Sequence, residues 1–197
     1  MAPGSSNHIK LVQQFASVAH GTQWRKFADE PYINHPVRVM EICAAYSKDE
    51  AVLAAALLHD VIEDTTTSST DIQGFLDGFM PREQSLKITQ LVIELTDVYV
   101  KENYPSWNRR KRKQQESIRM STVSADAQTI KYADILDNLG DIMNAGDEFA
   151  TKYVYECRSL LQYMRNGNAS LRNRVNDAIK NALSLLKGDT GAENGRR

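Results

Sequence analysis

Apolar residues recur at helical spacing along almost the whole chain, and this pattern predicts a protein built from helices. Leu11, Phe15, Val18 and Ala19, for example, share one face of an expected helix over residues 7–20. No stretch alternates apolar and polar residues over strand length, and no internal repeat is visible. We therefore expect an all-α fold, a single bundle of about eight to nine helices. The later expected helices span residues 34–46, 49–64, 71–79, 81–95, 108–120, 125–144, 147–166 and 170–187.

The two ends of the chain differ from the rest in composition. Residues 1–7 are small and polar, and residues 188–197 are rich in glycine and charge. Neither segment carries an apolar stripe that could pack on a core, so we expect a flexible N-terminus and a disordered C-terminal tail. Residues 8–187 are then one folded domain.

Composition and charge narrow the class of protein. The 197 residues are 42% hydrophobic and 25% charged, which suits one globular domain with a sizeable core. The net charge of −1 argues against general attraction to nucleic acid or membrane, and no apolar run reaches membrane-spanning length. Cys43 and Cys157 both lie in expected helices and read as buried thiols rather than a disulfide. We expect a cytoplasmic protein without a signal peptide.

The first chemical signal follows the most apolar helix. Residues 51–58 are all apolar and lead directly into His59, Asp60, Glu63 and Asp64. Burying three carboxylates and an imidazole together is costly unless a positive charge compensates them, and a bound cation is the simplest compensator. The competing interpretation is a helix that ends in a solvated, acidic turn.

Two other stretches carry similar side chains. His35 precedes Pro36 at the start of a helix, and Lys131, Asp134 and Asn138 share one face of another. Taken singly, His35 reads as a turn or packing residue, and Lys131 with Asp134 as a helix salt bridge. Only the combination of these stretches with the first points to chemistry.

Together the three stretches supply two imidazoles and two carboxylates: His35, His59, Asp60 and Asp134. Mixed nitrogen and oxygen ligands without cysteine suit manganese, iron or a catalytic zinc better than a structural zinc. Glu63 and Asp64 remain as carboxylates beside the metal. A metal-bound water next to a carboxylate is an arrangement that hydrolyses phosphate esters.

The order of these residues resembles that of the HD metal-dependent phosphohydrolases. The flanking text more closely resembles the hydrolase domain of RelA/SpoT homologues, which include the small alarmone hydrolases. The resemblance covers residues 20–166, and the Glu63–Asp64 pair separates this branch from other HD proteins. The matching segments are residues 19–26, 31–36, 55–65 and 130–139.

The resemblance implies a specific activity. Such enzymes use one manganese ion to hydrolyse guanosine tetra- and pentaphosphate at the 3′ position, giving GDP or GTP and pyrophosphate in the stringent response. By the same resemblance, the metal ligands are His35, His59, Asp60 and Asp134. Glu63 and Asp64 would position and activate the attacking water. Substrate contacts would come from Arg25 (against the purine), Lys26, Lys131 and Asn138. We expect a stand-alone hydrolase.

A basic run over residues 109–113, followed by Arg119, concentrates charge in a nearly neutral chain. It reads as a solvated helix face, a phosphate clamp or a nucleic-acid patch. Adjacent helical residues point in different directions, so they cannot all meet one ligand. We favour a mixture in which one or two side chains, such as Arg109 or Lys113, reach the substrate phosphates.

Residues 96–107 form a longer and more aromatic connection than the resemblance leads us to expect. A different nucleotide therefore stays open as the substrate: an adenosine alarmone, NADPH or a deoxynucleotide. A non-catalytic module that binds nucleotide or nucleic acid is a further alternative. We expect a small-molecule nucleotide as the partner, no membrane, and no nucleic acid; a homo-oligomer is compatible with the sequence.

Overall fold

The computed structural model describes residues 3–143 and 147–192, and those residues form ten helices and no strand beyond one isolated bridge between Trp24 and Pro31. The all-α prediction is therefore confirmed. In chain order the helices are α1 (Pro3–His20), α2 (Asn34–Ala44), α3 (Glu50–Leu58), α4 (Val61–Asp64), α5 (Ser69–Asp77), α6 (Arg82–Leu95), α7 (Arg109–Met120), α8 (Ala125–Ile142), α9 (Asp147–Tyr163) and α10 (Ala169–Ala192).

The structure corrects three of the predicted boundaries. Helix α1 begins at Pro3, a residue that suits the first turn of a helix, so residues 3–7 are helical rather than flexible. Helix α10 continues to Ala192, because each added residue gains one more backbone hydrogen bond at little cost. Residues 188–192 are thus not part of a disordered tail, and the predictions for residues 1–2 and 193–197 lie outside the described residues. The third difference is the division of one expected helix into two, which gives ten helices among the described residues instead of eight or nine.

The expected helix over residues 49–64 is divided into α3 and α4 at His59 and Asp60. Asp60 has φ −98° and ψ −5°, which leaves the helical path, and the backbone N–H of Asp64 donates to the Asp60 carbonyl at 2.8 Å to start the next turn. At its other end, α3 is capped by Asp49, whose carboxylate accepts the N–H of Ala51 at 2.9 Å. The division places His59 and Asp60 between the two helices.

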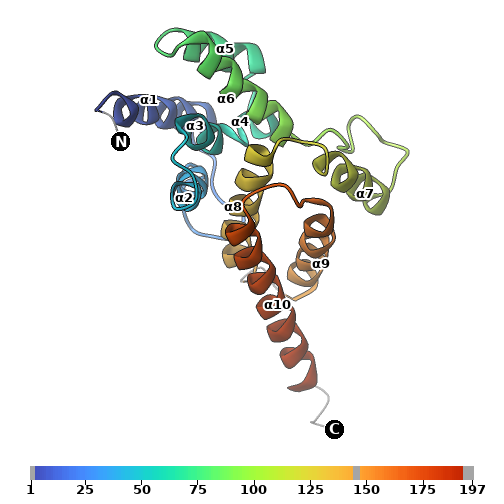
Figure 1. The fold of residues 1–197 in the computed structure, drawn as a ribbon. Helices are drawn as coiled ribbons and strands as arrows, with labels where there is room; N and C mark the ends of the chain where they lie inside the picture. Colours follow the sequence, from blue (N-terminus) through green and yellow to red (C-terminus); the bar gives the residue numbers. More distant parts are fainter. Residues whose placement is uncertain (1–2, 144–146, 193–197) are drawn as a thin grey trace.

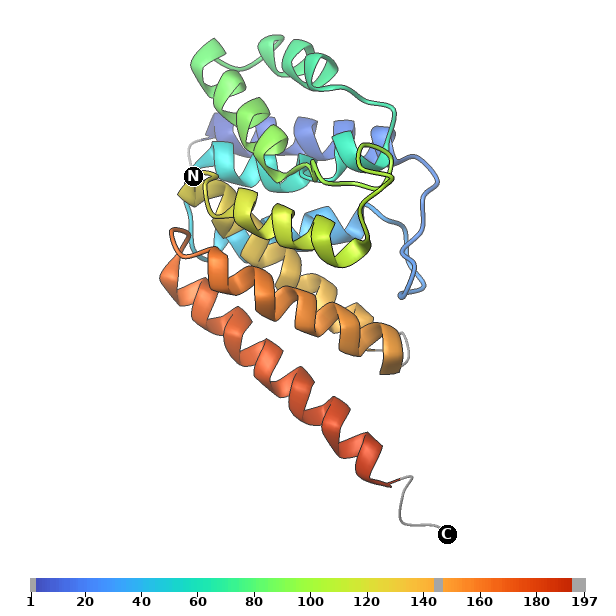
Figure 2. The same ribbon diagram turned by 90° about the vertical axis from the view of Figure 1, so that its right-hand side faces the viewer.

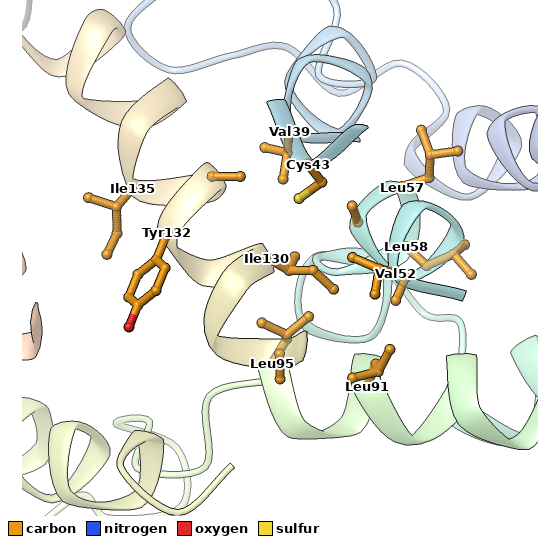
Figure 3. Packing of buried hydrophobic residues seen from close by; sticks show 14 of the residues in the cluster. Val39, Cys43, Val52, Leu57, Leu58, Leu91, Leu95, Ile130, Tyr132 and Ile135 are labelled. Carbon is orange, nitrogen blue, oxygen red and sulfur yellow. The ribbon is translucent and has the colours of Figure 1, made fainter. Parts of the chain in front are cut away.

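Helix α3 lies among α1, α2 and α6 in the first half of the molecule (Figure 1). Every residue from Ala51 to Leu58 is buried, and α1, α2, α6 and α8 all pack against it. Figure 3 shows Leu57 and Leu58 of α3 among apolar side chains from α2, α6 and α8. A helix that is apolar on all sides must lie inside the protein, and replacing one of its leucines with alanine would cost about 2–5 kcal/mol. The His59–Asp60 break is therefore held in a rigid, buried frame.

Helices α8, α9 and α10 pack side by side and form the second half of the molecule, in the lower part of Figure 2. Helix α8 joins the two halves, because it also packs against α2, α3 and α6. Helix α7 packs against α9 on the side away from α10 (Figure 1). None of the described helices has the length and apolar character that crossing a membrane requires.

The connection between α1 and α2 folds back on itself. Gly21, with φ 54°, adopts the left-handed conformation that ends α1, and its N–H donates to the Ser17 carbonyl at 3.0 Å. The N–H of Tyr32 donates to the Gln23 carbonyl at 2.9 Å, which closes the loop. This loop brings Arg25 and Tyr32 to the ends of α3 and α8, where the candidate site lies.

Candidate active site

The four side chains predicted as metal ligands lie together at the junction of α2, α3 and α8. His35 comes from the first turn of α2, His59 and Asp60 from the break after α3, and Asp134 from the middle of α8. His35, His59 and Asp134 are buried, and one ligand atom from each lies within 4.8 Å of the others. Three segments that are distant in the sequence thus place two nitrogens and a carboxylate around one point.

Asp60 completes this cluster. Its Oδ2 lies 3.1 Å from His59 Nε2 and 3.5 Å from His35 Nε2. Asp134 Oδ1 lies 3.3 Å from His35 Nε2 and 3.6 Å from His59 Nε2. Each imidazole nitrogen therefore faces both carboxylates.

The other ring nitrogens orient both imidazoles. His59 Nδ1 donates to the Ala56 carbonyl at 2.9 Å, and His35 Nδ1 donates to Asp137 Oδ2 at 2.7 Å. Each Nε2 is left pointing into the cluster, buried and without a hydrogen-bond partner among the described residues. Metal-binding histidines are held in this way, with one nitrogen donating to an oxygen and the other free to bind. The residues present therefore fit a divalent cation.

The negative charges of Asp60 and Asp134 favour a positive charge within the cluster. Burial lowers the pKa of both imidazoles, but the carboxylates outweigh it and raise the pKa of His35 to about 11 and that of His59 to about 9. Against the effect of burial, Lys131 and the two imidazoles hold the pKa of Asp134 well below its usual range. A divalent cation would replace the imidazole protons as the positive charge at this point.

Further residues make hydrogen bonds and ion pairs to Asp134 and to Asp137, which orients His35. Asp137 accepts from Arg38 Nε at 2.6 Å, and Arg38 also donates to Glu30 at 2.6 Å. Asp134 accepts from Asn138 Nδ2 at 2.5 Å and pairs with Lys131 Nζ at 2.8 Å. These contacts restrict the orientation of the carboxylates before any ligand arrives.

Glu63 lies beside the cluster with a strongly altered proton affinity. Although it lies at the surface, the protein atoms crowded around its carboxyl and the negative charges of Asp97 and Asp60 raise its pKa to about 7, against the effect of Lys131. The backbone N–H of Asp97 donates to Glu63 Oε2 at 3.2 Å. A carboxyl with a pKa near neutrality can both take and return a proton at physiological pH.

Asp64 is joined to the cluster through Tyr32. The Tyr32 hydroxyl lies 2.6 Å from Asp64 Oδ2 and 2.8 Å from Asp60 Oδ2. Burial and the charge of Asp60 raise the pKa of Asp64. The Tyr32 hydroxyl therefore links Asp64 to the candidate ligand Asp60.

Arg25 and Lys26 behave differently although they are adjacent. The Arg25 guanidinium donates to Asn138 Oδ1 at 2.7 Å and to Asp141 Oδ2 at 2.9 Å, and lies over the Tyr32 ring at 5.5 Å. Arg25 and Asn138 are thus part of the network that ends at Asp134. Lys26 instead lies over the aromatic rings of Phe27 and Phe149, at 5.2 and 5.5 Å. The structure brings Arg25 to the cluster but leaves Lys26 at its edge.

A groove of about 700 Å³ lies between α7 and α9, away from the candidate metal ligands. Arg109 lines it and donates twice to Glu156, at 2.7 Å each. Lys113 also lines it and donates to Asp97 at 2.9 Å. A smaller pocket of about 100 Å³ is lined by Lys113 and Glu156 on one side and by Lys131 and Asp134 on the other, so it connects the groove to the cluster.

The start of the aromatic connection is held against this pocket. Buried Glu116 of α7 accepts the backbone N–H groups of Val98 and Tyr99, at 3.1 and 3.2 Å. Arg119 donates to Glu116 and to the carbonyl of Thr96. These contacts place Asp97 between Glu63 and Lys113. Farther along, Tyr99, Tyr104 and Trp107 pack on one another.

Sequence reasoning did not single out Tyr32, Asp97, Asp137 or Arg38 as site residues. Asp137 could have been found, because it follows Asp134 by one helical turn. Tyr32 could have been found as well, because it precedes His35 by three residues. Asp97 carries no such signal, since a pair of contacts from α7 brings it to the site.

The sequence profile of the HD domain matches residues 13–166. The chain is 35% identical over 188 residues to the guanosine-3′,5′-bis(diphosphate) 3′-pyrophosphohydrolase of Drosophila melanogaster, across 91% of this chain and 97% of that protein. It is 30% identical over 175 residues to the enzyme of the same name from Xenopus tropicalis, across 85% and 90% of the two chains.

A solved structure gives the same relationship. It is described as a metazoan orthologue of SpoT that hydrolyses ppGpp and plays a role in starvation responses. It superposes on 92% of this chain and 96% of its own, with a TM-score of 0.73 and 28% sequence identity. The likeness in sequence and in structure therefore extends over almost the full length of both proteins.

Proposed function

Because this chain belongs to the HD domain family, in the branch that contains the guanosine-3′,5′-bis(diphosphate) 3′-pyrophosphohydrolases, we propose that it hydrolyses guanosine 3′,5′-bis(diphosphate) to GDP and pyrophosphate. The pentaphosphate would give GTP in the same way. The observation that carries this proposal is the buried group of two imidazole nitrogens and two carboxylates beside Glu63, whose pKa is about 7.

The cofactor in this proposal is one manganese ion held by His35, His59, Asp60 and Asp134. Two nitrogen and two carboxylate oxygen ligands suit Mn²⁺, and zinc or iron would also accept this set. When bound, the ion supplies Lewis acidity to the phosphoryl oxygens and lowers the pKa of a water ligand. The side chains around the ion would position the water, transfer protons and bind the substrate.

In the proposed reaction Glu63 takes a proton from water as the water oxygen bonds to the phosphorus attached to O3′. The bond between phosphorus and O3′ breaks, and the proton held by Glu63 returns through solvent to O3′, which becomes the free 3′ hydroxyl of GDP. The added oxygen departs in pyrophosphate. Desolvation of its carboxyl, together with the negative charges of Asp97 and Asp60, raises the pKa of Glu63, and this higher proton affinity favours its role as the proton acceptor. Asp64 would hold the water in line with the breaking bond.

Substrate contacts follow from the position of the cations. Arg25, whose guanidinium is oriented by hydrogen bonds to Asn138 and Asp141, would lie against the purine base. Lys131 lies beside Asp134, where it can offset the charge on the leaving pyrophosphate. Lys113 and Arg109 line the groove that leads away from the cluster and would receive the 5′ phosphates. Lys26 would contact the substrate only at the outer edge of the purine site.

The test is a nucleotide panel with purified protein and Mn²⁺: guanosine tetraphosphate, its adenosine counterpart, NADPH and a deoxynucleotide, with products separated by ion exchange. Pyrophosphate and GDP from the first, absent with Asp60→Ala, would support the proposal. Turnover of another nucleotide alone would assign a different substrate and would still support the proposed metal centre. Bound metal without turnover of any nucleotide would instead favour the binding module.

A further inference from the structure

The Tyr32 hydroxyl occupies a position that the proposed reaction leaves without a role. It lies within hydrogen-bond distance of two carboxylates, 2.8 Å from Asp60 Oδ2 and 2.6 Å from Asp64 Oδ2. Asp60 belongs to the candidate metal ligands and Asp64 to the pair assigned to the attacking water. One side chain outside both groups therefore touches a member of each.

The two carboxylates would separate without a bridge. Both side chains are carboxylates, Asp60 lies at the break after α3 and Asp64 at the end of α4, and Asp64 has an exposed side to which it could rotate. Like charges held close together repel, and water would solvate a released Asp64. The Tyr32 hydroxyl has one proton, so it donates to one of the two carboxylates at a time, and that hydrogen bond opposes the outward rotation of the carboxylate that accepts it. A cation bound to Asp60 would withdraw negative charge from that carboxylate. Asp64 would then be the stronger acceptor, and the Tyr32 hydroxyl would donate its hydrogen bond to Asp64.

Tyr32 is itself held in place through its ring and its backbone. Its ring stacks on buried His20 at 4.6 Å, and its backbone N–H donates to the Gln23 carbonyl at 2.9 Å. Gln23 accepts from His20 Nδ1 at 2.9 Å and donates to the backbone carbonyl of Asp64 at 2.7 Å. The loop after α1 is thus attached to both the backbone and the side chain of Asp64, and this attachment sets the position of the hydroxyl.

We propose that Tyr32 is a positioning residue that acts through Asp64: its hydroxyl keeps the Asp64 carboxylate directed at the attacking water. This inference rests on the proposed function, because it assumes a hydrolytic reaction at the cluster. It assigns no proton transfer to Tyr32 and no contact with the substrate.

Tyr32→Phe isolates the hydroxyl, since the ring and its stacking on His20 remain. We expect kcat to fall about 30-fold, KM to stay within about twofold, and Mn²⁺ affinity measured by calorimetry to stay within about threefold. Tyr132→Phe is the matched control. It also removes a tyrosine hydroxyl, one that is buried and donates to the Met164 carbonyl at 2.9 Å, and should lower the melting temperature while kcat is unchanged.

A double-mutant cycle with Asp64→Asn tests whether Tyr32 acts through Asp64. If it does, the double variant is no slower than Asp64→Asn alone, because the hydroxyl has nothing left to position. Fully multiplicative losses, or an unchanged kcat in Tyr32→Phe, would overturn the proposal.

A crystal structure of Tyr32→Phe gives a readout that does not depend on turnover. We expect Asp64 to be rotated toward solvent, and an Asp64 carboxylate in its original place would contradict the inference. If the wild-type protein hydrolyses a different nucleotide, the cycle is run with that nucleotide. If it hydrolyses none, the proposed function fails while the position of Asp64 still decides the role of Tyr32.

Discussion

The candidate metal centre and the α7–α9 groove differ in how the protein holds their charges. In the centre, the His35, His59 and Asp134 side chains are each less than a tenth exposed, and further hydrogen bonds orient them. In the groove, Arg109 and Lys113 are 46% and 44% exposed and paired with carboxylates. Buried groups lose most when one partner is removed, whereas exposed pairs contribute little and are screened by salt. Substitutions should therefore abolish function in one region and only adjust it in the other.

The largest effect is expected at the centre itself. His59→Ala removes an oriented nitrogen ligand, and the lost electrostatic stabilisation of several kcal/mol would reduce kcat by about a thousandfold or more. Elemental analysis should show loss of Mn²⁺, and circular dichroism should show that the helices persist. Full turnover by the metal-free variant would remove His59 from the site.

Glu63→Gln should separate metal binding from catalysis. The amide keeps the size of the side chain but cannot take a proton, so kcat should fall by about 10²–10⁴-fold. Mn²⁺ content should equal that of the wild-type protein, because Glu63 is not among the proposed ligands. An unchanged rate at pH 7 would show that another group accepts the proton.

Asp137→Asn tests whether the residues behind the ligands matter. The Asp137 carboxylate orients His35 by accepting from its Nδ1. The amide that replaces this carboxylate in the variant would weaken both that contact and the pair with Arg38. We expect Mn²⁺ affinity to fall by about 10–100-fold, measured by titration with a competing chelator. Equal affinity in the two proteins would mean that burial alone orients His35.

Lys113→Ala examines the groove. Removing one exposed cation should raise KM about tenfold at low salt and leave kcat nearly unchanged, with the difference shrinking as salt is added. Lys180→Ala, which removes an exposed lysine from α10, is the control for net charge. A lower kcat with unchanged KM would place Lys113 in the chemical step instead of in binding.

The smallest effect concerns pH. Asp97 raises the pKa of Glu63, whereas Lys131 lowers it and Asp60 raises it. Asp97→Asn removes one negative charge, so the pKa of Glu63 should fall and Glu63 should stay ionised to lower pH. The acid limb of the kcat profile is then expected to move to lower pH, with a change of only about twofold at pH 7. A shift to higher pH would contradict this electrostatic account.

The sequence predicts the buried region better than the exposed one. The α-helical class and the meeting of His35, His59, Asp60 and Asp134 follow from apolar spacing and from the order of ligand-type residues. The helices are local features, because each depends on its own apolar spacing. The meeting of the four side chains joins three distant segments, and it was predicted from the type and order of those residues and not from local structure. The break between α3 and α4 was missed, since only the contact of His59 with Ala56 and the turn at Asp60 reveal it.

The groove depends on contacts between distant parts of the chain. The basic run at 109–113 predicts a charged helix but not its partners. Lys113 pairs with Asp97, which is 16 residues away in the sequence, and Arg109 pairs with Glu156, which is 47 residues away. No periodicity encodes such pairs. The same is true of Asp97, whose place next to Glu63 depends on Glu116 and Arg119 holding the backbone before α7. Tertiary packing, rather than local propensity, decides this half of the site.

The burial of α3 restricts how proteins of this kind can diverge. Residues 51–58 have neighbours on every side, so any change of size or polarity there would endanger folding before it altered substrate choice. The freedom to acquire a new substrate lies instead in the partly exposed connection at 96–108 and on the facing surfaces of α7 and α9. We expect relatives with other substrates to keep the inner helix and to differ in this outer rim, so that natural selection varies the opening while the reaction centre stays constant.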